Sequence, residues 1–248
     1  MNRERVRTFV VGFDGEVLGG GIPAGQVVLL RGPTGTMKTS LAYYILYQNA
    51  LHDAPGVYIT LEQSAPSLLE QMASLGLHST RVSESLPILD LSRGRAQLQE
   101  LALQQAERRG RKETFETFLL EVLRAKIRDL QSRFGLRLLA IDSWDALAFA
   151  LDFRERRAQT FEFFDWLREL GVTSFLVTEV NSRNAADTES FDEAFLADAI
   201  LELSMEPVND IAFQRRIQCL KVRSANHDPG PFTLLFERER FEAARTIG

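Results

Sequence analysis

The sequence has little cysteine, little histidine and no long hydrophobic run, and each shortage excludes a class of protein. With a single cysteine, Cys219, among 248 residues, the chain can form no internal disulfide and fits a reducing compartment. Its three histidines are scattered without the spacing of a metal site. No apolar run reaches the ~18 residues that a membrane helix needs, and the N-terminal stretch lacks the apolar segment of a signal peptide. We therefore expect a cytoplasmic protein that does not bind membranes.

The sequence also lacks an excess of positive charge. It has 29 Lys and Arg against 34 Asp and Glu, a formal net charge of −5. This balance gives no whole-protein attraction to nucleic acid or to an anionic membrane. The hydrophobic content of 45% is enough for one good core. We predict a single domain over residues 1–248, with its core over about 8–236 and a short C-terminal tail over 237–248, and expect Cys219 to be a core residue.

Apolar runs that resemble strands alternate with longer segments that resemble helices. The expected strands are 27–30, 56–61, 87–91, 136–141 and 173–178, and the expected helices are 38–51, 67–75, 96–133 (one or two helices) and 159–170. Strands that are apolar throughout and separated by helices indicate a mainly parallel sheet covered on both faces. Three later runs, 199–204, 217–222 and 232–236, have no helices between them and predict an antiparallel edge. The predicted fold class is therefore α/β.

A phosphate-binding motif lies between the first strand and the first helix. Residues 32–39 read G-P-T-G-T-M-K-T and satisfy seven of the eight positions of the P-loop pattern G-x-x-x-x-G-K-S/T. The glycines let the chain turn its N–H groups inward, where they and the helix N-terminus bind phosphate oxygens. Lys38 would reach the β- and γ-phosphates, and Thr39 offers a hydroxyl to Mg²⁺. The motif predicts ATP and Mg²⁺ as ligands, with nucleotide contacts from Thr34, Gly35, Thr36, Met37, Lys38, Thr39 and Ser40.

Met37 is the departure from this pattern, because it stands where the P-loop has glycine. A methionine cannot cheaply adopt a positive φ. We therefore expect Met37 to take a helical φ and to point its side chain outward, so that the loop still closes. The substitution puts the strength of nucleotide binding in question more than its existence.

Two acidic residues end predicted strands. Asp142 ends the strand 136–141 and could hold a water on Mg²⁺, and Glu62 ends the strand 56–61 and is the candidate general base. Parallel strands bring their carboxyl ends to the same edge of a sheet as the P-loop. Either residue alone could be a helix cap or a solvated acid, so the interpretation depends on their pairing with the P-loop.

The order of these motifs resembles that of the KaiC-like ATPases of the RecA superfamily, over about residues 8–236. The resemblance rests on G-F-D at 12–14, L-G-G-G-I-P-A-G at 18–25, the P-loop, Glu62–Gln63, I-D-S at 141–143, Thr178–Glu179, and the K-x-R-x-x-x-H element of Lys221, Arg223 and His227. It implies a RecA-like P-loop fold and a ring, commonly a hexamer, with ATP bound between subunits.

The resemblance also implies further nucleotide contacts. Lys221 and Arg223 would reach the γ-phosphate of a neighbouring subunit's ATP, where cations stabilise the charge of the transition state. Ser74, Val222 and His227 match positions near the nucleotide in the family.

Two more departures limit what carries over from the family. Gln63 replaces the second glutamate of a pair and cannot act as a base, so Glu62 must act alone. Clock-type members carry a Ser/Thr pair shortly before the aspartate that corresponds to Asp198, and here those positions are Ala194 and Phe195. Neither has a hydroxyl, so we do not expect clock-style autophosphorylation.

Three functions remain open at this point. We favour an ATP-hydrolysing ring that acts as a switch for a regulatory protein partner. A DNA-dependent ATPase of the recombinase or helicase type is the alternative: residues 108–112 and 154–157 are basic, but residues 181–193 hold one Arg and four acids. A nucleotide-binding scaffold without hydrolysis is motivated by Met37 and Gln63.

The segment 159–170 is crowded with large apolar side chains. These could form a partner-facing surface, but we expect them in the core or in packing between subunits. They are Phe161, Phe163, Phe164, Trp166 and Leu167.

Overall fold

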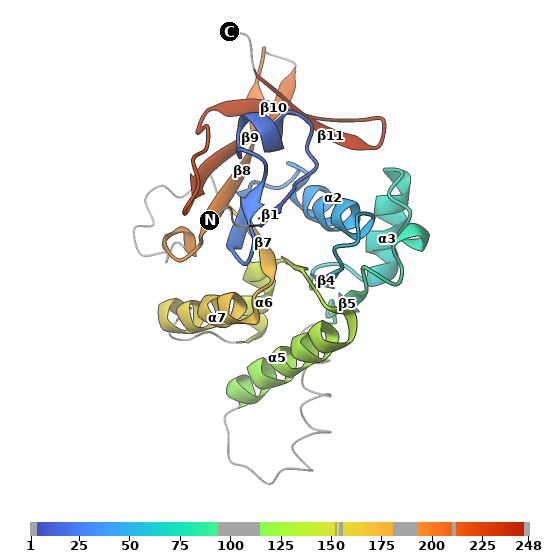
Figure 1. The fold of residues 1–248 in the computed structure, drawn as a ribbon, viewed down its shortest axis with the longest axis vertical. Coiled ribbons are helices and arrows are strands. Elements are labelled where there is room, and N and C mark those ends of the chain that lie inside the picture. Colours follow the sequence, from blue (N-terminus) through green and yellow to red (C-terminus); the bar gives the residue numbers. More distant parts are fainter. Residues whose placement is uncertain are drawn as a thin grey trace.

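A computed structural model of the chain describes residues 4–93, 115–151, 153, 156–180, 193–209 and 212–245. These residues form a nine-stranded sheet with helices packed on it, and a small two-stranded sheet lies near the N-terminus (Figure 1). The basic stretch 108–112, residues 154–155 of the basic stretch 154–157, and the segment 181–192 lie outside the described residues.

The strands of the large sheet follow the order β11-β10-β9-β8-β3-β7-β6-β4-β5. Their bounds are β3 Val27–Gly32, β4 Gly56–Thr60, β5 Ile88–Asp90, β6 Leu138–Asp142, β7 Thr173–Glu179, β8 Ala199–Pro207, β9 Phe213–Val222, β10 Pro231–Glu237 and β11 Arg240–Arg245. The small sheet pairs β1 (Arg5–Val6) with β2 (Ile22–Pro23) in antiparallel register.

The sheet is parallel from β8 to β5 and antiparallel from β8 to β11. Strand β3 pairs in parallel with both β7 and β8, and β6 pairs in parallel with β7 and β4. Strands β9, β10 and β11 follow one another as antiparallel hairpins. The predicted α/β class, with a mainly parallel sheet and an antiparallel C-terminal edge, is confirmed.

Helices cover both faces of the sheet (Figure 1). Their bounds are α1 Phe13–Glu16, α2 Lys38–Ala50, α3 Ala65–Ser74, α5 Phe115–Phe134, α6 Trp144–Ala150 and α7 Arg156–Leu170, with single 3₁₀ turns η1 at Ser79–Arg81 and η2 at Glu193–Phe195. Helices α2 and α3 pack on one face and α5, α6 and α7 on the other. None of these helices is long and apolar enough to cross a membrane.

Strand β3 shows why the buried strands carry no polar alternation. Its Val28 and Leu30 belong to the core on the α2 face, whereas Val27 and Leu29 belong to the core on the α7 face. Since successive side chains of a strand point to opposite faces, a strand between two layers of helices must be apolar on both.

The structure adds elements that the sequence pattern did not reveal. The expected tail contains strand β11, whose Phe241 is fully buried, so the core extends beyond residue 236. Helix α6 was also missed, because its seven residues are too few to show a helical period. Strand β9 begins at Phe213, four residues before the expected start at 217, because its first half alternates exposed and half-buried residues.

Four of the five large apolar residues singled out in 159–170 lie in the core, as expected. Phe163, Phe164 and Leu167 are fully buried, Trp166 is nearly so, and Phe161 is exposed. The prediction for Cys219 is also confirmed: it is fully buried on the α2 face, and burial raises the pKa of its thiol to about 12. A thiol with that pKa carries almost no thiolate at neutral pH and is a poor nucleophile.

Candidate active site

The carboxyl ends of four neighbouring parallel strands meet at one edge of the sheet. In the strand register, Gly32 at the end of β3 lies beside Glu179 of β7, and Asp142 of β6 lies beside Thr60 of β4. A cavity of about 290 Å³ opens at this edge. It is lined by Thr34, Gly35, Met37, Lys38, Thr39, Ser40, Glu62, Gln71, Asp142, Ser143, Val177 and Glu179. The predicted P-loop, metal and base residues are therefore brought together.

Two glycines shape the phosphate loop for different reasons. A Cβ on Gly32 would lie 2.2 Å from the backbone oxygen of Leu203, so the close approach of β8 excludes any side chain there. Gly35 has open space around it but a φ of 85°, which only glycine adopts at little cost. The Thr36 hydroxyl donates to the Pro33 oxygen at 2.8 Å, which closes the turn from inside.

Met37 does not take the helical φ that we expected. Its φ is 71° and its ψ is 29°, in the left-handed region, and it forms the N-cap of α2. The prediction was wrong because the course of the loop is fixed on both sides, by Gly35 and by the Leu41 amide, which donates to the Met37 oxygen at 2.9 Å. A left-handed conformation costs a non-glycine residue about 1–2 kcal/mol. The half-buried Met37 side chain packs against the core, and this contact works against that cost.

This conformation gives a prediction that compares two substitutions at one position. Met37→Ala removes the side-chain packing but keeps the Cβ, whereas Met37→Gly removes the packing and the backbone cost together. We expect the Gly variant to be more stable than the Ala variant by about 1 kcal/mol, because glycine is preferred at positive φ and at N-caps. Thermal unfolding measures the difference.

The matched control lies inside helix α3, where the order reverses. Ala73 is an exposed helical residue, so Ala73→Gly is expected to lower stability by about 1 kcal/mol. If the Met37 pair shows the same order as the helical position, the left-handed φ of Met37 is contradicted.

Lys38 is a buried cation surrounded by acids. Its ammonium donates to the Pro33 oxygen at 2.9 Å, and the side chain lines the cavity. Burial lowers the pKa of Lys38 from its ordinary value, against the opposing effect of Glu179, Asp142 and, more weakly, Glu62. The surrounding carboxylates thus help to keep Lys38 charged, and a phosphate group would do the same.

Asp142 is buried at the end of β6 and is held by two hydroxyl groups. The Tyr58 hydroxyl donates to Asp142 Oδ2 at 2.7 Å, and the Thr39 hydroxyl also hydrogen-bonds to this carboxylate. Burial raises the pKa of Asp142 above its usual range, against the opposing effect of these two bonds. Burial and the nearby carboxylate raise the pKa of Tyr58 well above its ordinary value, so Tyr58 is a neutral donor.

Thr39 and Asp142 fit the protein side of a magnesium site. Mg²⁺ commonly binds one or two protein oxygens and takes its other ligands from substrate phosphates and water. No cluster of three or more His, Cys, Asp or Glu suited to a metal exists among the described residues. The Thr39 hydroxyl and the Asp142 carboxylate, beside the phosphate loop, would therefore hold an ion together with a bound phosphate rather than alone.

Glu62 is exposed and faces the cavity from the end of β4. Its Oε1 accepts a hydrogen bond from the Ser143 hydroxyl. The Ser143 oxygen also accepts from the Ala146 amide at 3.2 Å and so caps helix α6. The peptide bond between Asp142 and Ser143 is cis. Ser143 thus links the candidate base to the strand that carries the candidate metal ligand.

Glu179 and Asp145 form a polar connection that was not among the predicted site residues. Glu179 Oε1 accepts from the Thr34 hydroxyl at 2.8 Å, and Asp145 Oδ2 accepts from the Thr178 hydroxyl and the Glu179 amide at 2.8 and 2.9 Å. Glu179 ends a buried strand, so the rule that identified Glu62 and Asp142 could have found it. Asp145 follows from no such rule, because its contact depends on the placement of α6.

Two more residues at the site carry no sequence signal. Gln71 of α3 lines the cavity and is joined to Gln63, whose amide donates to Gln71 Oε1 at 3.3 Å. Arg215 of β9 donates from Nε to the Gly35 oxygen at 3.4 Å, at the tip of the loop. This contact joins residues 180 positions apart, so only the sheet order brings them together.

The residues predicted from the family's K-x-R-x-x-x-H element lie far from this cavity. Strand β9 runs antiparallel to β8, and its Lys221 pairs with Ile200, which lies beside Leu29 near the start of β3. At about 3.3 Å per residue, Lys221 is roughly 10 Å along the sheet from Gly32. Val222, Arg223 and His227 follow in sequence, beyond Lys221 at the edge opposite the phosphate loop.

Ser74 also lies outside the lining of the cavity. It is exposed at the last position of α3, and its hydroxyl donates to the Gln71 oxygen at 2.7 Å. Its predicted nucleotide contact and those of Lys221, Val222, Arg223 and His227 remain predictions.

Comparisons with known proteins match nearly the whole chain. The KaiC ATPase family model matches residues 6–240. The circadian clock oscillator protein KaiC 1 of Synechocystis sp. is 31% identical over 240 residues, which are 93% of this chain and 43% of that protein. The circadian clock protein KaiC2 of Synechocystis sp. is 26% identical over 234 residues, 93% of this chain and 38% of that protein. The chain thus spans less than half the length of these relatives.

A solved structure shows the same fold. The KaiC-like protein of the hyperthermophilic archaeon Pyrococcus horikoshii OT3 superposes with a TM-score of 0.74 at 24% identity. The superposition covers 98% of this chain and the whole of that chain.

Proposed function

Since the chain belongs to the KaiC ATPase family, a RecA-like family of nucleotide-binding ATPases, we propose that it binds Mg-ATP and hydrolyses it. We further propose that it does so in a homo-oligomeric ring, a hexamer, and acts as a nucleotide-dependent switch for a protein partner. The observation that carries the proposal is the meeting of Lys38, Thr39, Glu62 and Asp142 at one cavity, from two strand ends and one helix start.

In this proposal the phosphate loop binds the nucleotide before any chemistry occurs. The loop N–H groups and the start of α2 bind phosphate oxygens, and Lys38 neutralises charge at the β- and γ-phosphates. When bound by Thr39 and Asp142, Mg²⁺ would supply further positive charge at these phosphates. The carboxylates near Lys38 favour a nucleotide that brings its own cation.

Glu62 is the group that takes the proton in this reaction. Water attacks the γ-phosphorus, the bond between the γ-phosphorus and the β–γ bridging oxygen breaks, and ADP leaves with that oxygen. The Glu62 carboxylate orients the water and accepts its proton. Gln63 cannot replace it, because an amide is no base and because its side chain is joined to Gln71.

Lys221 and Arg223 enter the reaction only through a second subunit. They lie at the sheet edge opposite their own phosphate loop. In a closed ring with head-to-tail interfaces, one edge of each subunit meets a different edge of the next. Cations that reach the neighbour's γ-phosphate would stabilise transition-state charge and make turnover depend on assembly.

The switch in this proposal depends on the bound nucleotide and not on phosphorylation of the chain itself at the clock positions. Ala194 and Phe195 stand where clock-type relatives carry hydroxyl residues, and neither side chain can accept a phosphoryl group.

The test of this function is the ATP turnover per subunit across a series of protein concentrations. We expect turnover to rise several-fold as the ring assembles and to be unchanged by single-stranded DNA. Turnover should be lost in the control variant Lys38→Ala, which lacks the phosphate-binding ammonium. Light scattering on the same samples reports assembly. Turnover that appears only with DNA would assign the chain to the recombinase or helicase class. Bound ATP without turnover in the assembled state would make it a scaffold.

A further inference from the structure

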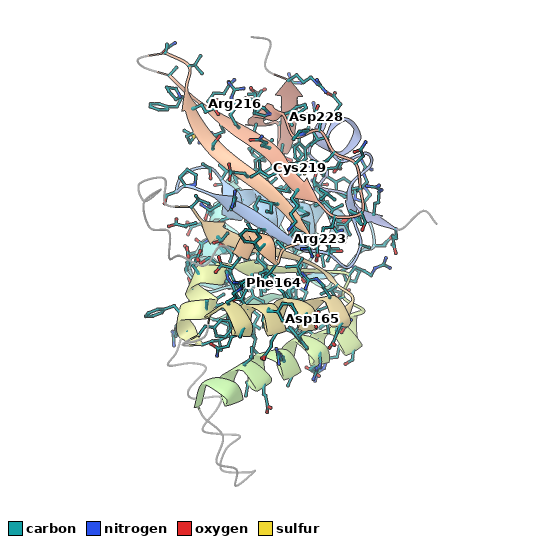
Figure 2. All side chains as sticks on the ribbon, turned by 90° about the vertical axis from the view of Figure 1, so that its left-hand side faces the viewer. Phe164, Asp165, Arg216, Cys219, Arg223 and Asp228 are labelled. Atoms are coloured by element: carbon teal, nitrogen blue, oxygen red, sulfur yellow. The ribbon has the colours of Figure 1, made fainter. Side chains whose placement is uncertain are left out.

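Asp198 joins two arginines at the sheet edge opposite the phosphate loop. It is almost completely buried at the start of β8, and its Oδ2 accepts from the Val27 amide at 3.0 Å and from Arg168 Nε at 2.9 Å. Its Oδ1 accepts from Arg223 Nη1 at 3.2 Å. One carboxylate thus pairs with two guanidinium groups, that of Arg168 from α7 and that of Arg223 from the end of β9, where Figure 2 labels Arg223.

The second arginine, Arg223, is held at three points. Besides the Asp198 carboxylate, its backbone amide donates to the Asp198 oxygen at 2.8 Å, and its Nη2 donates to the Phe195 oxygen at 3.1 Å. Lys221 is tied to the same turn, since its ammonium donates to the Ala194 oxygen at 3.0 Å. The Arg223 side chain nevertheless stays 51% exposed. It is therefore oriented and still open to a second molecule.

Arg168 and Arg223 both pair with the Asp198 carboxylate, and Arg168 also lies 3.9 Å from the carboxylate of Asp165. The buried Asp198 carboxylate orients the Arg223 guanidinium, whose side chain remains half exposed at this edge. A free arginine side chain loses rotamer entropy when it is fixed. A side chain already fixed in its own subunit brings an oriented cation to a phosphate without that loss.

We propose that Asp198 is the positioning residue for Arg223, and that it sets the guanidinium in the orientation that reaches the nucleotide of the neighbouring subunit. The inference rests on the proposed function, because it requires that Arg223 acts across the ring. Arg168 supports the arrangement by holding the other oxygen of the same carboxylate and, through Nη2, the Leu196 oxygen.

The first test is Asp198→Asn in the full-length, assembled protein. Asparagine keeps the shape and can still accept from the Val27 amide, but it removes the charge that pairs with Arg223. We expect kcat to fall about tenfold and KM for ATP to stay within about twofold, because a misplaced group affects the transition state more than substrate binding. The matched control is Asp165→Asn. Figure 2 labels Asp165 on α7. Its exposed carboxylate lies 3.9 Å from Arg168, and its loss is expected to leave kcat unchanged.

Mixed rings separate an effect on the neighbour from an effect on the subunit's own site. Glu62→Gln subunits lack the proposed base but keep Asp198 and Arg223. In a mixture with Asp198→Asn subunits, each Asp198→Asn site that faces a Glu62→Gln neighbour has its own base and receives a correctly oriented arginine. Turnover of the mixture should therefore exceed the average of the two separate variants. Turnover equal to that average would mean that Asp198 acts within its own subunit, and the proposal would be overturned.

The same mixture made with Arg223→Ala tests the underlying function separately. If Arg223→Ala and Glu62→Gln subunits restore turnover together but the Asp198→Asn mixture does not, only the role of Asp198 is wrong. If neither mixture gains turnover, the action of Arg223 across the ring is wrong as well.

If Asp198→Asn does not fold cooperatively, Arg223→Lys tests the need for a positioned guanidinium instead. Lysine keeps the charge but cannot donate in the fork that reaches Asp198 and Phe195 together. At this exposed position it is expected to keep the melting temperature and to lose kcat about tenfold, with KM within about twofold. Parent-like kcat in Arg223→Lys would contradict the need for a positioned fork.

Discussion

We expect Glu62→Gln to lower the turnover of ATP by about 10²- to 10⁴-fold, the range that a positioned general base contributes. The substitution is nearly isosteric, and the Ser143 hydroxyl that donates to Glu62 can donate equally to the amide oxygen of glutamine. The cavity, the phosphate loop and the candidate metal ligands therefore keep their structure. Steady-state turnover, with ATP affinity measured separately by equilibrium binding, should show a loss in kcat and an affinity within a few-fold of the parent.

A matched control for this change lies on the next helix. Glu70 is exposed on α3 and does not line the cavity, so Glu70→Gln should hydrolyse ATP at the parent rate. If Glu62→Gln itself turns over ATP as fast as the parent, Glu62 is not the base.

Asp142→Asn is expected to raise the stability of the protein and to lower its turnover of ATP. Burial raises the pKa of Asp142, so the native state binds a proton there more tightly than the unfolded chain does. At neutral pH the ionised carboxylate therefore lowers the free energy of unfolding, and asparagine removes this effect. We expect the ligand-free variant to melt above the parent, by about 2–4 °C for each kcal/mol of unfavourable burial that asparagine removes. We also expect turnover to fall by at least about 100-fold, because the proposed metal ligand is lost.

The difference in melting temperature between Asp142→Asn and the parent should change with pH in one direction only. As the pH falls through the raised native-state pKa, Asp142 takes up a proton and its unfavourable contribution disappears. The gap in melting temperature between variant and parent should therefore narrow on acidification. Melting curves at several pH values, without nucleotide, measure it. The control Asp129→Asn removes an exposed partner of Arg133 and should change stability by less than about 1 kcal/mol. A lower melting temperature for Asp142→Asn at neutral pH would mean that the bonds from Tyr58 and Thr39 outweigh burial.

The confirmed predictions depend on local patterns. Apolar strands that alternate with helical segments identified the parallel sheet, and the P-loop sequence identified the turn between β3 and α2. The resemblance to KaiC-like ATPases, read from the order of motifs, is confirmed by the family match over residues 6–240. The strand-end rule identified Glu62 and Asp142 as cavity residues, because parallel strands bring their carboxyl ends to one edge.

The wrong or missing predictions concern residues whose conformation depends on a neighbour far away in the sequence. Propensity assigns Met37 a helical φ, but the flanking turn and helix start hold it in the left-handed region. Strand β11 was not predicted, because it lies at the edge of the sheet and carries few apolar residues. Only Phe241 and Ala243 of its six residues are buried.

The sequence by itself determined the fold class, the family and the place of the phosphate-loop motif, because each is written in residues that lie close together along the chain. Only the tertiary structure decided which residues share a space. It brought Gln71 and Glu179 into the cavity and joined Arg215 to Gly35 across 180 positions. It also separated Lys221 from its own phosphate loop and joined Arg168 and Arg223 at Asp198. The physical reason is that these contacts follow from strand order and register, which are set by the packing of the whole sheet rather than by any local pattern.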